Sequence, residues 1–186
     1  MKKRLYIGVL TLALCCFAVG CGDKKEKDPK AELRADIVEF VNEELPSIKA
    51  DRDSAVAIYN NYFTADDVSV EAFAADLRAN AIPTMETYIV NLTAVEVSTD
   101  EVEGLKNLYL QSAQKQYEAM NKVASAIEEQ NTDYLTEADV LINESKSLLT
   151  QYESQLKILA FDNDITINGT FTSQTTEPES ATSDTQ

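Results

Sequence analysis

Closely spaced carboxylates are the side chains of this 186-residue chain that could support acid–base chemistry. Asp36, Glu39 and Glu43 are three and four residues apart, a spacing that would place them on one face of a helix. Asp66-Asp67 and Glu128-Glu129 are adjacent acidic pairs near predicted helix ends. Such groups can act as general acid and base where their pKa values differ. A solvated acidic face explains the same pattern, and we favour that interpretation.

The residue types that are missing exclude several kinds of site. The sequence contains no histidine, which excludes Ser-His-Asp and Cys-His catalysis and the usual zinc sites. Its five glycines form no phosphate-binding loop. We therefore expect a non-enzymatic protein without a cofactor.

A run of oxygen-bearing side chains follows the last predicted helix. Asp162, Asp164, Thr166 and Asn168 alternate in the way calcium ligands do. An EF-hand loop requires glycine at its sixth position and glutamate at its twelfth. Counted from Asp162, the glycine here comes eighth and the twelfth residue is Ser173, so we expect no metal site.

The N-terminus has the pattern of an export signal. Lys2, Lys3 and Arg4 precede an uncharged apolar run over residues 5–19. This run is shorter than the roughly 20 residues that a membrane-spanning helix needs. All three cysteines, Cys15, Cys16 and Cys21, lie at or near its end, so no disulfide is expected in the body of the protein.

The segment Ala18-Val19-Gly20-Cys21 resembles a bacterial lipobox. The resemblance implies cleavage between Gly20 and Cys21, diacylglyceryl and palmitate-type acylation of Cys21, and attachment to the outer face of the cell membrane. Leucine is commoner than alanine at the position of Ala18. A plain signal peptide cut elsewhere and an uncleaved anchor are the alternatives.

These features divide the chain into four parts. We predict a signal peptide at 1–20, a lipidated cysteine with a charged tether at 21–30, a helical domain at 31–167, and a disordered polar tail at 168–186. Removal of the signal leaves 13 basic and 32 acidic residues. Such a surface repels nucleic acid and favours cationic peptides or basic protein surfaces.

Helical periodicity dominates the predicted domain. Apolar residues recur every three or four positions over about 30–63, 69–96, 99–129 and 133–161, and only Gly104 interrupts residues 31–161 with a glycine. The sequence predicts an all-α fold, an antiparallel bundle of four long helices with coiled-coil-like packing. Ser69, Thr132 and a Ser98–Glu101 capping box are the expected helix starts.

Two prolines fall inside the first two predicted helices. Pro46 and Pro83 follow Leu45 and Ile82, which are poor N-caps, so we expect kinks rather than new helices. Counted from the first inter-helix link, both prolines lie at nearly the same height. We therefore expect the two helices to bend together.

Aromatic residues gather where the first predicted helix ends. Tyr59, Tyr62, Phe63 and Phe73 could form a contact patch for a peptide or glycan, and a packed end of the core is the alternative that we favour.

The whole layout resembles the small, uncharacterised helical lipoproteins of Gram-positive bacteria, some of which are described as cell-wall-binding. This resemblance implies a cell-envelope protein that binds another protein, a peptide or a wall polymer. An accessory or immunity protein that sequesters cationic peptides is the second hypothesis, and an enzyme is the third.

Overall fold

The computed structural model describes residues 29–64 and 69–167, and every regular element in these ranges is helical. The chain forms α1 (Pro29–Glu39), η1 (Phe40–Glu44), α2 (Leu45–Thr64), α3 (Val70–Asp76), η2 (Leu77–Ala81), α4 (Ile82–Ala94), α5 (Asp100–Glu128) and α6 (Asp133–Asp162). The elements α1, η1 and α2 follow one another without a break and make a first column, and α3, η2 and α4 make a second. The two columns, α5 and α6 match the four predicted helices to within about two residues at each end.

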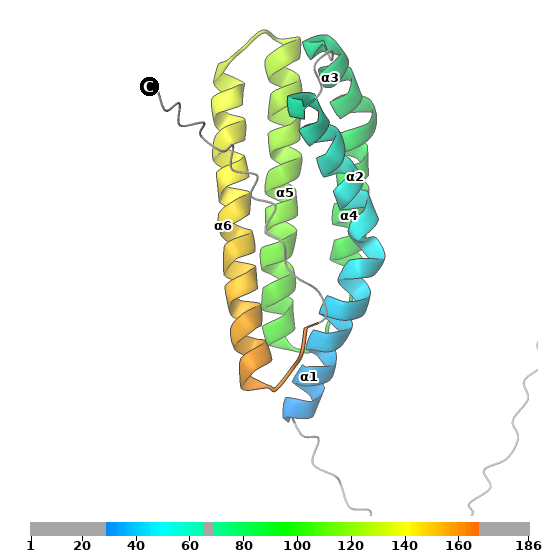
Figure 1. Cartoon of the computed structure of the whole chain (residues 1–186), viewed down its shortest axis with the longest axis vertical. Coiled ribbons are helices and arrows are strands. Elements are labelled where there is room, and N and C mark those ends of the chain that lie inside the picture. The colour runs from blue at the N-terminus through cyan, green and yellow to red at the C-terminus, as the bar shows by residue number, and fades with distance from the viewer. Residues whose placement is uncertain (1–28, 65–68, 168–186) are drawn as a thin grey trace, which may run out of the picture.

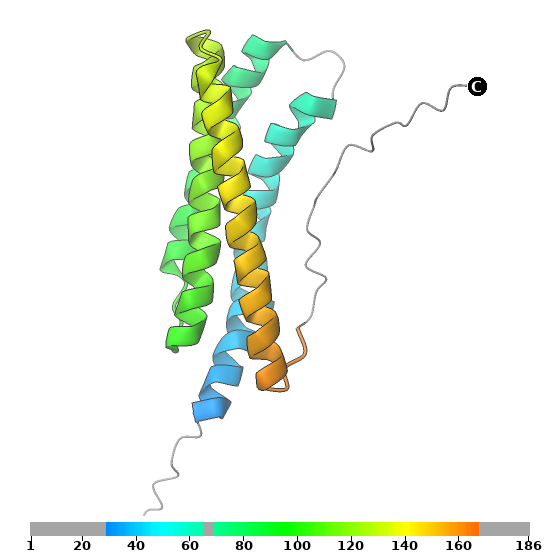
Figure 2. The same cartoon turned by 90° about the vertical axis from the view of Figure 1, so that its left-hand side faces the viewer.

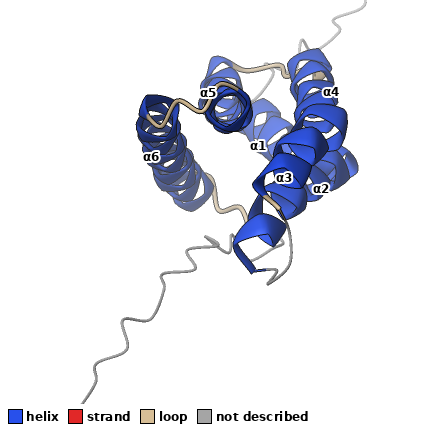
Figure 3. Ribbon diagram, turned by 90° about the horizontal axis from the view of Figure 1, so that it is seen from above, coloured by secondary structure: helices blue, strands red, loops and turns tan. Residues whose placement is uncertain are grey.

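The four columns lie side by side as a helical bundle (Figure 1). A short turn joins α5 to α6, so these two helices run in opposite directions (Figure 2). Seen along the bundle, α5 lies between α6 and α4, and α4 packs in turn against α2 (Figure 3). The most extensive contact is between α5 and α6. The predicted all-helical fold is confirmed, and the arrangement of the four columns supports a helical bundle.

Each proline is preceded by a π-helical turn. The N–H of Leu45 donates to the carbonyl of Phe40, and the N–H of Ile82 donates to that of Leu77, five residues earlier in both cases. A proline ring clashes with the carbonyl four residues before it. For Pro46 and Pro83 that carbonyl lies inside the π turn, where the wider helix gives the ring room. Each column therefore continues through its proline.

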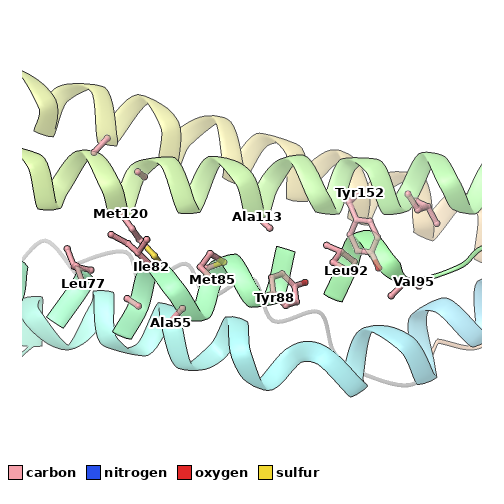
Figure 4. Packing of buried hydrophobic residues seen from close by; sticks show 14 of the residues in the cluster. Ala55, Leu77, Ile82, Met85, Tyr88, Leu92, Val95, Ala113, Met120 and Tyr152 are labelled. Atoms are coloured by element: carbon pink, nitrogen blue, oxygen red, sulfur yellow. The ribbon is translucent and has the colours of Figure 1, made fainter. Parts of the chain in front are cut away.

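The core lies between the columns and is built from the predicted apolar stripes. Leu77, Met85, Tyr88 and Leu92 of the second column point toward Met120 of α5 and Tyr152 of α6 (Figure 4). All six side chains are buried. Burial of an apolar side chain of this size contributes about 1.5–3 kcal/mol, so this layer accounts for much of the attraction between the columns.

Small residues allow α5 and α6 to approach closely. Ser112, Ala119 and Ala126 are seven residues apart on α5, and Ala138 and Ser145 are seven apart on α6. All five are buried. The Ser112 and Ser145 hydroxyls are 2.8 Å apart across this interface, so each satisfies the other inside the core.

Two of the expected helix starts differ from the prediction. Ser69 does cap α3, since its hydroxyl accepts the N–H of Ala72 at 3.1 Å. The Ser98–Glu101 capping box is wrong, because α5 begins one residue later, with Thr99 as its N-cap, and another residue binds the free N–H groups there. Thr132 is the N-cap residue of α6, but its side chain makes no capping bond. Asn131 accepts the N–H of Asp133 in its place.

Candidate binding groove

A groove of about 670 Å³ lies along the surface of the α5–α6 pair, near the turn that joins the two helices. We call it the hairpin groove. Helix α5 contributes residues at three- and four-residue steps, and the first half of α6 supplies the other wall. Its lining consists of Tyr117, Glu118, Asn121, Lys122, Ser125, Glu129, Tyr134, Glu137, Val140 and Leu141.

The chemistry of the hairpin groove is acidic and aromatic. Three carboxylates, those of Glu118, Glu129 and Glu137, face a single ammonium group, that of Lys122. The rings of Tyr117 and Tyr134 add aromatic surface. Carboxylates beside aromatic faces bind ammonium and guanidinium groups through charge and cation–π attraction.

Lys122 shows this chemistry within the chain itself. Its ammonium is 2.5 Å from the carboxylate of Glu137 and 4.6 Å from the centre of the Tyr134 ring. The hydrogen bond to Glu137 raises the pKa of Lys122, so the ammonium stays charged. The groove wall on α6 thus holds a lysine side chain by an acid and an aromatic ring together.

Arg78 of η2, in the second column, forms hydrogen bonds with three residues of α5. Its guanidinium donates to Asn121 at 2.8 Å, to Ser125 at 2.9 Å and in bidentate form to Glu128 at 3.0 and 2.8 Å. The hydrogen bonds from Arg78, and to a smaller extent its charge, lower the pKa of Glu128. Asn121 and Ser125 also line the groove, so the bonds from Arg78 hold two of its side chains in place.

Two groove carboxylates remain for a ligand. Glu118 is 3.8 Å from Lys115, whose ammonium lies closer to Glu144 of α6, at 2.8 Å. Within the described residues no cation lies within ion-pair distance of Glu129, which is exposed. These two groups give the groove its net negative character.

The predicted aromatic patch is a packed cluster in the described part of the chain. Tyr62 stacks on Phe73 with ring centres 4.1 Å apart and planes 9° apart, and Tyr59 is tilted against Phe73 at 6.2 Å. Phe73 is buried and both tyrosines are half-buried. Burial, with a smaller effect from Asp139 of α6, raises the pKa of Tyr59. The side chain of Phe63 lies outside the described residues.

The three acidic residues predicted to share one face of the first column differ in their exposure to solvent. Glu39 and Glu43 are exposed, as expected for a solvated face. Asp36 is 6% exposed, and its carboxylate binds Ser98 and Thr99 at the start of α5. The solvated interpretation is therefore wrong for Asp36. Asp66-Asp67 lies outside the described residues, and Glu128-Glu129 ends α5.

The other sequence candidates lie at or beyond the ends of the bundle. Asp162 and Asp164 are exposed, and no group of three metal-binding side chains occurs within 29–64 and 69–167. Asn168 lies outside these ranges, as do the signal peptide at 1–20, the lipidation site Cys21 with Gly20, most of the tether, and the tail at 168–186. None of the described helices combines the length and apolarity needed to cross a membrane.

Comparison of the chain with family models, with curated proteins and with solved structures finds no match.

The hairpin groove was not predicted from the sequence, although the sequence contains a signal for it. Tyr117 and Tyr134 stand beside the apolar stripes of their helices rather than on them. A tyrosine beside the stripe, such as Tyr117 next to the acid Glu118, indicates an aromatic side chain that the core buries only in part.

Proposed function

We propose that this protein is an extracytoplasmic lipoprotein, anchored through lipid on Cys21 to the outer face of the cell membrane, that binds an envelope partner and performs no catalysis. The hairpin groove carries the proposal, because it is an acidic, tyrosine-lined surface whose two carboxylates Glu118 and Glu129 are available to a ligand.

The position of the groove fits an anchored protein. The groove lies near the α5–α6 turn, whereas α1 begins at the opposite end of the bundle (Figure 1). The tether from Cys21 leads into α1, so an anchored molecule presents the hairpin groove away from the membrane. Each long helix measures about 43 Å at 1.5 Å per residue, and the groove residues of α5, Tyr117 to Glu129, lie in the half that is farther from the start of α1 (Figure 1).

The groove favours one class of partner over the others. The two carboxylates that remain for a ligand, Glu118 and Glu129, and the tyrosines beside them suit lysine or arginine side chains of a basic protein segment or a cationic peptide. An anionic wall polymer would be repelled by the same groups. Sequestration of free cationic peptides is the second candidate function, and this chemistry supports it equally.

Acylation of Cys21 is tested by expressing the full chain in a bacterial host and examining its membrane fraction. We expect mass spectrometry to find an N-terminal diacylated cysteine, and Cys21→Ser to move the protein out of the membrane fraction. Cys16→Ser is the matched control and should leave acylation intact. An unmodified Cys21 in mature protein would reject the anchor.

Binding at the groove is tested with a fluorescein-labelled decalysine peptide and fluorescence anisotropy. Glu118→Lys together with Glu129→Lys should weaken binding by about ten-fold or more. The control Glu39→Lys with Glu43→Lys makes the same change of net charge on exposed residues of the first column. Equal loss in both variants would mean that net charge alone attracts the peptide, and no binding to wild type would reject the groove.

The predicted kinks are a separate part of the proposal, because they lie in the first two columns and not in the α5–α6 pair that forms the hairpin groove. We propose that the first two columns bend at Pro46 and Pro83, where the π turns lie. The bend can be measured with spin labels at Val38→Cys and Ala57→Cys, since the helical domain has no other cysteine. Double electron–electron resonance gives the distance between the two labels. Pro46→Ala should lengthen this distance, and an unchanged distance would contradict the kink.

A further inference from the structure

We propose that the last turns of α6 form a second contact surface, in which Ile158 and Phe161 touch the lipid surface beside the anchor. This inference rests on the proposed acylation of Cys21. It goes beyond it, because it assigns a membrane-binding role to two side chains of the folded body and thereby an orientation to the bundle.

Ile158 and Phe161 are exposed in a way that the core does not explain. Phe161 is 84% exposed, more than any other large apolar side chain in the described residues, and Ile158 is 57% exposed. They are three residues apart, so they lie next to each other on one face of α6. Scattered single apolar residues are normal on surfaces, but an adjacent pair with a phenyl ring is a small apolar patch.

The patch lies at the end of the bundle that the tether reaches. Both views show the start of α1 and the last turn of α6 at the same end (Figures 1 and 2). A shallow depression at this end is lined by residues of both helices, including Lys30 and Leu33 of α1 and Asp162 of α6. The C-terminal turns of α6 are therefore close to the point where the chain enters the bundle.

The length of the tether limits how far this end can stand from the membrane. Eight residue steps separate Cys21 from Pro29, the first residue of α1. A fully extended chain covers at most about 3.5 Å per residue, which gives about 28 Å, and a relaxed chain covers less. A tilt of the bundle toward α6 brings Phe161 to the interface within that reach.

The charges at this end determine the kind of contact. Two exposed lysines, Lys30 and Lys157, lie at this end of the bundle, but they are outnumbered by four carboxylates, those of Glu32, Asp100, Glu101 and Asp162. These carboxylates are repelled by anionic headgroups. The contact therefore depends on the apolar pair, and added salt should strengthen it on anionic vesicles by screening the repulsion.

The chain offers a direct test because it contains no tryptophan. Phe161→Trp in the acylated full-length protein places a single reporter in the patch. The matched control is Leu135→Trp, at the other end of the same helix, where the side chain is 43% exposed. Each protein is reconstituted into phosphatidylcholine vesicles that contain lipid with a doxyl quencher at a shallow acyl position.

We expect the tryptophan at position 161 to be blue-shifted and quenched, at a depth of about 5–10 Å, and the one at 135 to stay unquenched. Equal absence of quenching at both positions, in protein that floats with the vesicles, would overturn the lipid contact and leave the anchor standing. A blue shift without quenching would mean that protein covers the patch, which also overturns the proposal. Failure to float would reject the anchor, and the lipid contact with it.

Discussion

The carboxylate of Asp36 accepts both the backbone N–H and the hydroxyl of Thr99, at 2.8 and 2.5 Å. Thr99 is the N-cap residue of α5, and the N–H of Ser98 donates to the same carboxylate at 3.0 Å. The N-terminus of α5 is thus capped by a side chain of α1, which lies 63 residues earlier in the chain, and not by a neighbouring residue. Its negative charge also lies favourably at the positive end of the α5 dipole.

Asp36→Ala should destabilise the protein by about 3 kcal/mol. The variant loses charge-assisted hydrogen bonds and leaves two N–H groups at the start of α5 without this acceptor. Urea denaturation followed by circular dichroism measures the effect. Glu39→Ala, an exposed acid on the same helix, is the control and should change stability by less than about 0.5 kcal/mol. Equal effects of the two substitutions would show that the cap contributes nothing.

The Arg78–Glu128 contact should make stability depend on pH in acid. Arg78 lowers the pKa of Glu128 below its ordinary value near 4.5, so the folded state binds the proton less tightly than the unfolded state does. The stabilisation is complete above pH 4.5 and is lost as the pH falls through the lowered pKa. Wild type should therefore be more stable than Glu128→Gln at pH 7, and this difference should shrink toward pH 3. A difference that is constant with pH would contradict the assignment, and Glu129→Gln serves as the neighbouring control.

Two buried tyrosines should make the protein sensitive to alkali. Burial raises the pKa of Tyr88 and of Tyr152 above the ordinary value of 10. The unfolded chain loses these protons near pH 10 while the folded chain keeps them. Stability is therefore intact below pH 10 and falls above it, by up to about 1.4 kcal/mol per pH unit for each tyrosine.

Urea denaturation at pH 9, 10.5 and 11.5 measures this loss, and Tyr152→Phe should reduce the slope above pH 10. Absorbance at 295 nm gives an independent measure, since the two buried tyrosines should ionise only as the protein unfolds. Ionisation of Tyr88 and Tyr152 in folded protein with the ordinary midpoint near pH 10 would refute the prediction.

The limits of the four helical columns could be predicted because they depend on local features. Apolar spacing, the near absence of glycine and a cap such as Ser69 are all readable within one helix turn. The capping role of Asp36 could not be predicted, because its hydrogen-bond partners lie more than sixty residues away in the chain. One signal was present, since Asp36 is three residues after Leu33 and four before Phe40 and so shares the side of the helix that faces the core.

The hairpin groove was hidden for a related reason. Periodicity identifies the residues that a helix buries, and the groove consists of residues beside that stripe on two helices. Only the packing of α5 on α6, fixed by small residues such as Ala119 and Ala138, brings Tyr117 and Tyr134 to one surface. The π turns were likewise unforeseen, because a proline inside a helix is compatible with a kink, a break or a wider turn.

The end of α5 shows a conformation that its sequence disfavours, and this gives the last prediction. Gln130 has φ 52°, in the left-handed region, where glycine is the preferred residue. The N–H of Asn131 donates to Ala126 at 3.0 Å and that of Gln130 to Ile127 at 3.3 Å, the two bonds of a Schellman motif. These bonds satisfy the last carbonyls of α5 and hold the turn into α6.

Gln130→Gly should therefore stabilise the protein by about 1 kcal/mol, because it removes the steric cost of a side chain at positive φ. The gain is partly offset by the greater freedom of glycine in the unfolded chain. Gln130→Ala keeps a Cβ atom and should give no gain, which makes it the control. The urea midpoint of the glycine variant should rise at an unchanged slope. A fall in the midpoint would mean that the Gln130 side chain contributes more to the turn than its backbone conformation costs.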